Sequence, residues 1–504
     1  MYILGFGLGH PGMYCASDRV GVLCGRLLNV TQSGTVVRQE VREFIKPFVP
    51  APIRLRVRRI VGRMRSTPTR PVLPPMQRAD AHLESLQYAR RRTLGRSGVT
   101  RFSLRPVHRF FNVIGVPAQA LPGEWWSHLL FERASIQAYS ANGDPKFIEC
   151  TKALDPQLMG ALEWLEVYLL LLRVGLYHSA NVVRDHARTR ALSVDITQCT
   201  PTEGKLYLAA ALELRQYEKV EDACLALEEE GAETELVATS RFLMALYQGA
   251  VGSAVPRTDE DLLYREYVAS RSVAVVGPAP AGACSADEID SHDRVVRLNF
   301  GESGKGCDPC SRGLRSDVTY FNHEFARRLF EAGMPIPEEL KWVVFRGPSW
   351  KTKYSAAFGR AHVTARGFDV SPNMCLFNGD FNAIPNVVLD LLRFDSYSVK
   401  VFHADLMLTV QRFAGYHWWA DCSFDQGVDE QIRLIENYLR SFVFHDPVTQ
   451  YVLLSNLWEA GRVVGDERFT EVMRLGCEEY MRQMQTVYGE PFNAYLWRKV
   501  ADER

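Results

Sequence analysis

The sequence predicts an α/β protein in which a mostly parallel sheet is flanked by helices and preceded by an all-α, repeat-like region. In the second half of the chain, short apolar runs alternate with amphipathic helical patterns, which is typical of a parallel sheet covered on both faces. Between about 155 and 250 the pattern is helical throughout. We therefore divide the chain into residues 1–130, 150–255 and 268–504.

Length and composition are those of a globular protein. A chain of 504 residues is long enough for two or three domains, and 47% apolar with 23% charged residues is an ordinary balance. The most apolar segment, "LEWLEVYLLLLRVGLY", includes Glu163, Glu166 and Arg173, so it predicts a buried helix rather than a membrane span. The N-terminal residues make a poor signal peptide. Eleven scattered cysteines favour a reduced, cytoplasmic protein over a disulfide scaffold.

Residues 1–130 are rich in proline and arginine, and no hydrophobic period persists there. Basic residues crowd the part from Arg38 to Arg109, although the net charge of the whole chain is +0. The acidic residues of that part are Glu40, Glu43, Asp80 and Glu84. A poorly ordered basic arm is one interpretation, and peripheral contact with anionic lipid at the cytoplasmic membrane face is another. No nucleic-acid recognition module accompanies the charge, so we predict no nucleic-acid partner.

Residues 150–255 contain two helical hairpins. The first turns around Gly175 and Tyr177, and the second turns around Arg215 and Tyr217. Small residues in both cores resemble tetratricopeptide repeats, although the full repeat signature is absent. Such a unit serves as a spacer, an oligomerisation surface or a docking platform.

In residues 268–504, short apolar runs predict the strands. These runs are Val273–Val276, Val295–Leu298, Trp342–Phe345, Val399–Phe402 and Phe442–Phe444. Ligands of parallel sheets bind beyond the carboxyl ends of the strands. That rule points to Gly277, Asn299, the stretch after Phe402, and His445.

The loop "GPAPAG" begins at Gly277. A glycine at the end of a strand lets the backbone approach a phosphate, and free amides of the loop could bind it. The spacing is not the G-x-G-x-x-G of dinucleotide-binding folds, so an NAD site is not predicted.

Two histidines are candidates for chemistry. His417 lies in the aromatic stretch "GYHWWADC", which fits a core cluster or a stacking wall beside a phosphate. His445 precedes Asp446 and Pro447, a helix cap and a favoured first helical residue. Near a helix N-terminus the dipole disfavours the imidazolium, and a neutral histidine can act as a general base. A structural role is the alternative for both residues.

No metal site is predicted from the sequence. Cys307 and Cys310 have the spacing of a metal-ligand pair, but neither a second such pair nor a clear histidine pair accompanies them.

Four stretches in the second half resemble motifs of the sialyltransferases, glycosyltransferase family 29. "VAVVG…EIDSHDRVVRLN" resembles the family's large motif, and "IPNVVLDLLRFDSYSVKVFHAD" occupies the place of its small motif. "YHWW" resembles the third motif, and "HDPVTQ" resembles the very short motif. The resemblance covers roughly residues 270 to 465. It implies a Rossmann-like, GT-A-like sheet. The animal members join two of these motifs by a disulfide that this sequence lacks, which fits a reduced compartment and suggests a bacterial or viral type of member.

The chain departs from the family pattern at several positions. Pro278 replaces an asparagine, and Ala383–Pro385 stands where the small motif has Ser-Thr-Gly. Gln450 replaces the glutamate of the very short motif. Ser272 and residues 394–396 contain none of the cysteines that join the two larger motifs in animal members.

The resemblance implies a metal-independent, inverting transfer of sialic acid, or a related 2-keto sugar, from a CMP-sugar to a hydroxyl of a glycan or glycolipid. His445 would be the general base, and His417 would stabilise the departing phosphate. The implied donor-binding residues are Gly277, Asn299, Asn322, Trp418 and Gln450. No cofactor is implied beyond the donor substrate. Two alternatives stay open: a different nucleotide-sugar transferase, and a scaffold protein with a degenerate transferase domain.

Overall fold

The fold is taken from a computed structural model of the chain. It describes residues 145–229, 234–250, 258–280, 285–299, 309–322, 338–346, 363–396, 398–410 and 428–502, together with parts of 77–86, 108, 116–129, 325–327 and 331. Most of the basic segment, and the predicted residues His417, Trp418 and Cys307, lie outside the described residues.

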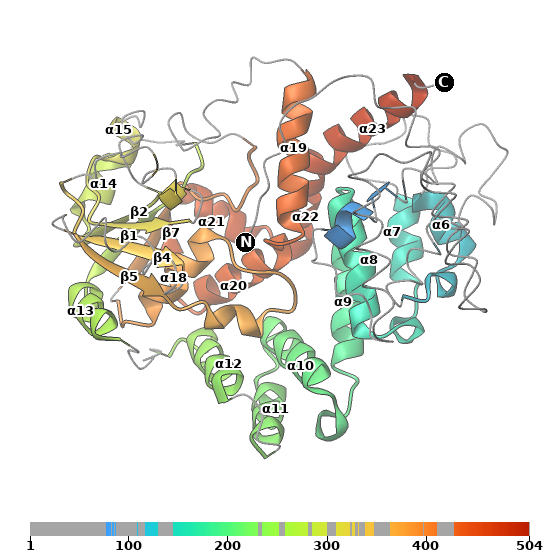
Figure 1. The fold of residues 1–504 in the computed structure, drawn as a ribbon, viewed down its shortest axis with the longest axis horizontal. Helices are drawn as coiled ribbons and strands as arrows, with labels where there is room; N and C mark the ends of the chain where they lie inside the picture. Colours follow the sequence, from blue (N-terminus) through green and yellow to red (C-terminus); the bar gives the residue numbers. More distant parts are fainter. Residues whose placement is uncertain are drawn as a thin grey trace, which may run out of the picture.

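A seven-stranded sheet forms one side of the molecule (Figure 1). Its strands are β1 (Ser272–Val276), β2 (Arg294–Leu298), β3 (Val318–Phe321), β4 (Trp342–Arg346), β5 (Thr364–Phe368), β6 (Ser398–Phe402) and β7 (Val464–Gly465). They lie in the order β5-β4-β3-β2-β1-β6-β7, and every pair is parallel. The predicted parallel α/β sheet, preceded by a helical region, is confirmed.

The sheet has a topological switch point between β1 and β6. From β1 the chain adds β2 to β5 on one side and then returns to pair β6 with the other side of β1. At such a point the connections leave the sheet in opposite directions and open a crevice at the carboxyl ends of the strands. The topology therefore draws attention to the residues that follow β1 and β6.

Both faces of the sheet are buried, which explains the near-continuous apolar runs. Val273 and Val275 pack in the main core, where α18 (Ala383–Leu392) contacts β1 and β6. The alternate residues Ala274 and Val276 pack on the opposite face with Ile289 of α14 (Ala286–Ser291). This two-residue alternation follows from the geometry of a strand.

The helical region contains two hairpins of the same design. α8 (Ala161–Arg173) and α9 (Tyr177–Ala191) form the first, and α10 (Pro201–Glu213) and α11 (Tyr217–Glu229) form the second. Each turn has one residue in the left-handed region, Gly175 with φ 74° in the first and Arg215 with φ 54° in the second. α12 (Thr234–Tyr247) packs against α11. The two predicted hairpins are therefore present, with turns at the predicted residues.

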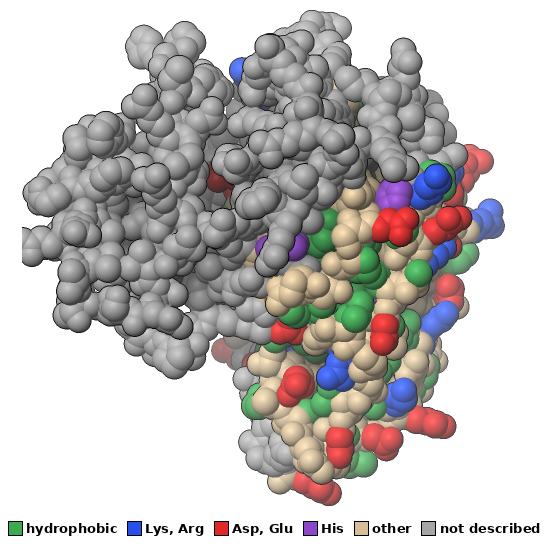
Figure 2. Space-filling view, turned by 90° about the vertical axis from the view of Figure 1, so that its right-hand side faces the viewer, with side chains coloured by type: hydrophobic (Ala, Val, Ile, Leu, Met, Phe, Trp, Pro, Cys, Tyr) green, Lys and Arg blue, Asp and Glu red, His purple; other side chains and the backbone are tan. Residues whose placement is uncertain are grey.

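The described residues contain further helices. They are η2 (Ala118–Ala120), α6 (Gly123–Leu129), α7 (Pro145–Lys152), η4 (Pro156–Leu158), η5 (Ile196–Gln198), α13 (Asp259–Val268), α15 (Pro309–Arg312), η7 (Ser371–Cys375), α19 (Val428–Phe442), α20 (Pro447–Glu459), α21 (Glu467–Arg474), α22 (Cys477–Met484), η9 (Gln485–Gly489) and α23 (Glu490–Asp502). In Figure 1, α19 to α22 lie between the sheet and the hairpin α8–α9, and α23 runs past the upper end of that hairpin. On the face beside α6 to α9, acidic and basic side chains of the described residues are interspersed (Figure 2).

The helical region and the sheet share one apolar core, which runs from Trp164 in α8 to Val275 in β1. The first hairpin turn also packs closely on the C-terminal helices. A Cβ at Gly175 would lie 2.5 Å from the Cα of Gly489, and Asn493 donates to the carbonyl of Val174 at 2.7 Å. The two regions therefore interlock.

One predicted strand is wrong. Residues 442–444 end helix α19 and enter a turn, because the buried residues Ile435, Leu439 and Phe442 continue a helical face to the end of the run. β3, β5 and β7 were not predicted. Among the described helices, none combines the length and apolarity that crossing a bilayer requires.

Candidate functional site

The carboxyl edge of the sheet brings together several of the predicted residues. Gly277 follows β1, Asn299 follows β2 and Asn322 follows β3. His403 follows β6, and Arg346 ends β4. Because all the strands are parallel, these five residues line one edge of the sheet.

Gly277 and His403 meet at the switch point. A Cβ on Gly277 would lie 2.5 Å from the carbonyl oxygen of His403, so glycine is needed for the ends of β1 and β6 to pack. His403 has φ 50° and is 3% exposed. Its N–H donates to Asp466 at 2.7 Å, and its ring nitrogen Nε2 lies 3.1 Å from the carbonyl oxygen of Ser311. Burial lowers the pKa of His403, and the charge of Arg312 adds to this effect. The sequence indicated the stretch after Phe402 without identifying this histidine.

In residues 277–280, the part of the loop after β1 that the structure describes, both backbone N–H groups are already bonded. The N–H of Gly277 donates to Phe402 at 2.8 Å, and the N–H of Ala279 donates to His403 at 2.9 Å. Pro278 and Pro280 have no N–H. Residues 277–280 therefore have no backbone donor left for a phosphate. Positive charge is supplied beneath the loop instead, because the buried guanidinium of Arg312 donates to the carbonyls of Gly277 and Ala279.

Asn299 and Asn322 contact each other. Asn299 adopts φ 51°, a conformation that asparagine tolerates better than most residues, and its side-chain oxygen accepts from the N–H of Asn322 at 2.9 Å. The side-chain oxygen of Asn322 accepts from the N–H of Phe325 at 2.7 Å. The two asparagines therefore fix the ends of β2 and β3.

His445 lies in the short connection between α19 and α20. Its N–H donates to Ser441 at the end of α19, at 2.7 Å. Its ring nitrogen Nδ1 lies 3.2 Å from the carbonyl oxygen of Asp380. A carbonyl can only accept, so Nδ1 carries the hydrogen and, in the neutral ring, Nε2 is the basic nitrogen. Burial lowers the pKa of His445 to about 4, and the charge of Arg346 adds to the lowering although the Asp380 carbonyl opposes it. At neutral pH the imidazole is therefore uncharged.

The loop of residues 377–382 holds His445 against the sheet edge. Gly379 has φ 73°, and a Cβ there would collide with the carbonyl oxygen of Phe444. The next residue, Asp380, donates its N–H to that carbonyl at 2.7 Å and pairs with Arg346 at 2.6 Å. The loop thus connects the end of β4 to His445.

Gln450 supports this loop from the first turn of α20. Its Nε2 donates to the carbonyl of Asp380 at 3.0 Å, and its Oε1 accepts from the N–H of Asn382 at 2.8 Å. A glutamate carboxylate accepts only, so it would replace the first bond with a repulsion between two acceptors. The glutamine that departs from the family pattern therefore suits its contacts here, and both ends of its side chain bind the loop.

Asp446 caps α20, as the sequence predicts, and Pro447 is the first helical residue. The side chain is 0% exposed. It accepts from the N–H groups of Val448 and Thr449 at 2.9 and 3.3 Å. Asn378 and Tyr168 also donate to it, at 2.9 and 2.6 Å. Asp446 therefore joins the helix start, the supporting loop and the helical region at one carboxylate.

The charge that balances Asp446 comes from the helical region. Arg184 of α9 is 0% exposed and donates to Asp446 at 2.5 Å, to Glu213 of α10 at 2.5 Å and to Thr449 at 2.7 Å. Arg188 also pairs with Glu213, at 2.8 Å. No sequence pattern indicates this partnership, because an arginine in an amphipathic helix normally predicts a solvated face.

The most specific part of the family resemblance lies away from the carboxyl edge. In "EIDSHD", Asp293 accepts from the N–H and hydroxyl of Ser272 at the beginning of β1, both at 2.9 Å. Asp290 accepts from the N–H groups of Leu314 and Arg315 at 3.1 and 3.3 Å. These side chains hold the strand starts and the loop after α15, so in this chain the stretch is scaffolding.

The comparisons with known proteins add no relative: no family model, curated protein or solved structure matches the chain. The chemistry of the site therefore rests on its geometry. The edge combines the neutral imidazole of His445 with the buried cation Arg312 and with Arg346, which pairs with Asp380. The N-termini of α18 and α20 lie beside it, and each is already capped by a side chain, Asn382 or Asp446. Guanidinium groups favour a bound anion. This arrangement suits a reaction in which an anionic substrate binds and a base removes a proton from it or from a second substrate.

Proposed function

We propose that the chain is an inverting, metal-independent glycosyltransferase of the sialyltransferase type. It would move sialic acid, or a related 2-keto sugar, from a CMP-sugar to a hydroxyl of a glycan or glycolipid. A basic N-terminal region would bring it to an acceptor at the cytoplasmic membrane face. Four motif resemblances in the expected order support the proposal, together with the geometry around His445.

One observation carries the proposal. His445 is held neutral at a sheet edge by burial, and its Nδ1 is committed to the carbonyl of Asp380 at 3.2 Å. Its Nε2 is therefore a proton acceptor of fixed tautomer. A general base for a sugar hydroxyl requires this state of the ring.

In the proposed reaction, Nε2 of His445 takes the proton of the acceptor hydroxyl as its oxygen attacks the anomeric carbon. The bond from that carbon to the phosphate of CMP breaks, and the phosphate leaves with the electron pair. A base with a pKa of about 4 is available but weak. An anionic phosphate close by would raise the pKa of the imidazole, so the donor would strengthen the base that acts on it.

The remaining assignments follow from the family resemblance. His417 would donate to the departing phosphate, where negative charge grows in the transition state. Trp418 would stack on the donor, and Gly277, Asn299 and Asn322 would border the nucleotide. Because Gln450 binds the loop that carries Asp380, we assign it to positioning the base.

The test is release of CMP from a panel of CMP-sugars and acceptors. We expect the wild type to turn over. In His445→Gln the rate should fall by roughly 10²–10⁴-fold, which is the contribution that base catalysis typically makes. The matched control is His292→Gln, because His292 precedes β2, at the opposite end of that strand from Asn299, and bonds to the carbonyl of Glu288. Unchanged turnover in His445→Gln would remove this residue from the mechanism.

A scaffold protein with a degenerate transferase domain is the second candidate. It is favoured by the loop 277–280, whose amides are committed to backbone partners. Thermal shift with CMP, UMP, GMP and NAD separates the candidates. Stabilisation by CMP alone supports the transferase, stabilisation by another nucleotide indicates a different nucleotide-sugar enzyme, and no response to any of them supports the scaffold.

A further inference from the structure

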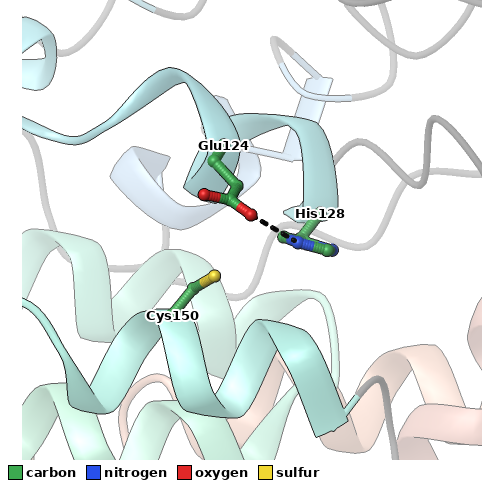
Figure 3. Close-up of side chains that lie close together, drawn as sticks. All are labelled: Glu124, His128 and Cys150. Atoms are coloured by element: carbon green, nitrogen blue, oxygen red, sulfur yellow. Dashed lines mark ion pairs between the residues drawn. The ribbon is translucent and has the colours of Figure 1, made fainter.

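Three side chains with metal-binding atoms converge at the junction of α6 and α7. Glu124 and His128 are one helical turn apart on α6, and Cys150 lies on α7. Figure 3 shows Glu124 and His128 turned toward each other, with Cys150 directed at them from the neighbouring helix. Their ligand atoms all lie within 4.8 Å of one another, and the distance from Oε1 of Glu124 to Nε2 of His128 is 3.9 Å.

The helices that carry these residues are fixed by buried contacts immediately beside them. Trp125 follows Glu124 and donates through its indole nitrogen to the hydroxyl of Thr151, at 3.1 Å. Thr151 follows Cys150, is 0% exposed, and accepts through its carbonyl from the ring of His186 at 2.8 Å. The Trp125 ring also packs on Phe147, with ring centroids 5.3 Å apart. Buried contacts therefore hold the backbone on both sides of the cluster, while Glu124 is exposed and His128 and Cys150 are half-buried.

We propose that Glu124, His128 and Cys150 bind a divalent transition metal, with zinc as the best fit. Thiolate sulfur, imidazole nitrogen and carboxylate oxygen are the three donor types that zinc takes from proteins. The thiolate and the carboxylate together neutralise a divalent cation. Zinc–ligand bonds of about 2.0–2.3 Å require the three atoms to draw closer by a small side-chain rotation, and the exposed Glu124 is free to make it.

Three protein ligands leave one position of a tetrahedral site for water or for a donor from outside the cluster. The site is distinct from the sheet edge that carries His445, since its ligands come from α6 and α7 alone. The proposal is therefore independent of the function proposed above. The sequence contains its signal, a glutamate and a histidine four residues apart on a helix, but the cysteine is brought in by packing.

Titration with Co²⁺ tests the site without any assay of activity. The purified full-length protein is titrated under reducing conditions, and the thiolate-to-cobalt charge-transfer absorption in the near ultraviolet is recorded. We expect the wild type to show a stronger band than Cys150→Ser. The difference between the two should saturate at one equivalent of Co²⁺ and disappear when Zn²⁺ is added. The chain has eleven cysteines, so the variant is compared with Cys310→Ser, which removes an exposed thiol outside the cluster.

The expected results differ clearly between variants. Cys150→Ser abolishes the cluster's share of the band, whereas Cys310→Ser leaves it intact. His128→Gln weakens zinc binding at least ~100-fold. Removing a residue that only hydrogen-bonds to a metal ligand typically weakens binding ~10–100-fold, so the larger loss identifies His128 as a ligand itself. Zinc raises the melting temperature of the wild type but not that of His128→Gln. A band of equal size in Cys150→Ser and the wild type, or no band in either, would overturn the proposal and leave Glu124 and His128 as a surface ion pair.

Discussion

Two arginines of the helical region each hold two carboxylates, and they differ in burial. Arg184 bonds Asp446 and Glu213 with 0% of its side chain exposed, whereas Arg241 of α12 bonds Glu221 and Glu228 with 34% exposed. All four distances are between 2.5 and 2.7 Å. Similar geometry thus occurs in two environments with different energetic consequences. The buried cluster fixes the helix start beside His445, and the exposed cluster joins α11 to α12.

The physical difference is the cost of leaving a charge without its partner. A buried pair is weak evidence of stabilisation by itself, but removing one partner strands the other in a medium that solvates it poorly. An exposed pair that is broken is solvated by water and typically contributes about 0–1 kcal/mol. The two arginine clusters therefore have different roles in the helical region. The cluster of Arg184 supports the candidate site, and the cluster of Arg241 lies at the surface.

The largest expected effect comes from Arg184→Met. This change leaves Asp446 without its buried cation, and we expect the free energy of unfolding to fall by about 3–5 kcal/mol. The measurement is denaturant unfolding, with Arg241→Met as the matched variant. If the two variants lost similar amounts, burial would not distinguish the clusters.

Activity sharpens the same comparison. Where Arg184→Met is still folded at low temperature, we expect it to lose CMP release because the start of α20 moves. Arg241→Met should retain wild-type turnover. An active Arg184→Met would show that the base does not depend on the ion pair between Arg184 and Asp446.

Acid is expected to lower the free energy of unfolding through His445, which lies beside the buried pair of Asp446 and Arg184. The pKa of His445 is lowered to about 4 in the folded state, chiefly by burial, against about 6.5 in the unfolded chain. Between these values the unfolded state binds the proton and the folded state does not. The free energy of unfolding therefore falls as the pH drops from about 7 toward about 4. The full shift corresponds to about 3 kcal/mol, and the remaining exposure of the ring reduces this to about 2 kcal/mol.

The measurement is unfolding free energy at several pH values for the wild type, His445→Gln and Arg241→Met. Between about pH 7 and about pH 5, above the range in which carboxylates titrate, His445→Gln should show a flatter profile than the wild type. Arg241→Met should keep the wild-type slope there, because the Glu228 carboxyl whose pKa Arg241 lowers stays charged in that range. Equal slopes in all three proteins would mean that His445 titrates normally.

Gln450→Glu probes an uncharged contact within the buried junction. The substitution removes the bond to the carbonyl of Asp380 and places two acceptors together, for an expected loss of about 1–3 kcal/mol. Gln157→Glu is the control, because Gln157 is exposed at the surface of the helical region. Denaturant unfolding of both variants decides the matter, and a Gln450→Glu protein as stable as the wild type would show that glutamate fits this position.

The sequence predicts those features that depend on local pattern. The runs that became β1, β2, β4 and β6 were identified, as were both hairpin turns and the cap at Asp446, since each has its signal within a few residues. The run at 442–444 was misassigned because a short apolar run at the end of an amphipathic helix resembles a strand. β3 was missed although "VTYF" is a β-branched and aromatic run that is fully buried.

Contacts between residues far apart in the chain could not be predicted from the sequence. Arg184 and Asp446 are 262 residues apart, and no periodicity connects them. The same holds for His445 and Asp380, whose contact sets the tautomer of the candidate base, and for the close approach of Gly277 to His403. In each case the fold brings together two residues whose local patterns are unremarkable.

The smallest expected effect belongs to Arg241→Met, which should cost less than about 1 kcal/mol. Salt completes the comparison, because at about 1 M the screening length falls to about 3 Å. Screening should remove the contribution of an exposed pair and leave a buried one nearly unchanged. The difference in unfolding free energy between Arg241→Met and the wild type should therefore vanish in high salt, while that of Arg184→Met persists. If salt erased both differences, solvent would reach Arg184, and the support of His445 by the helical region would have to be explained by packing rather than by charge.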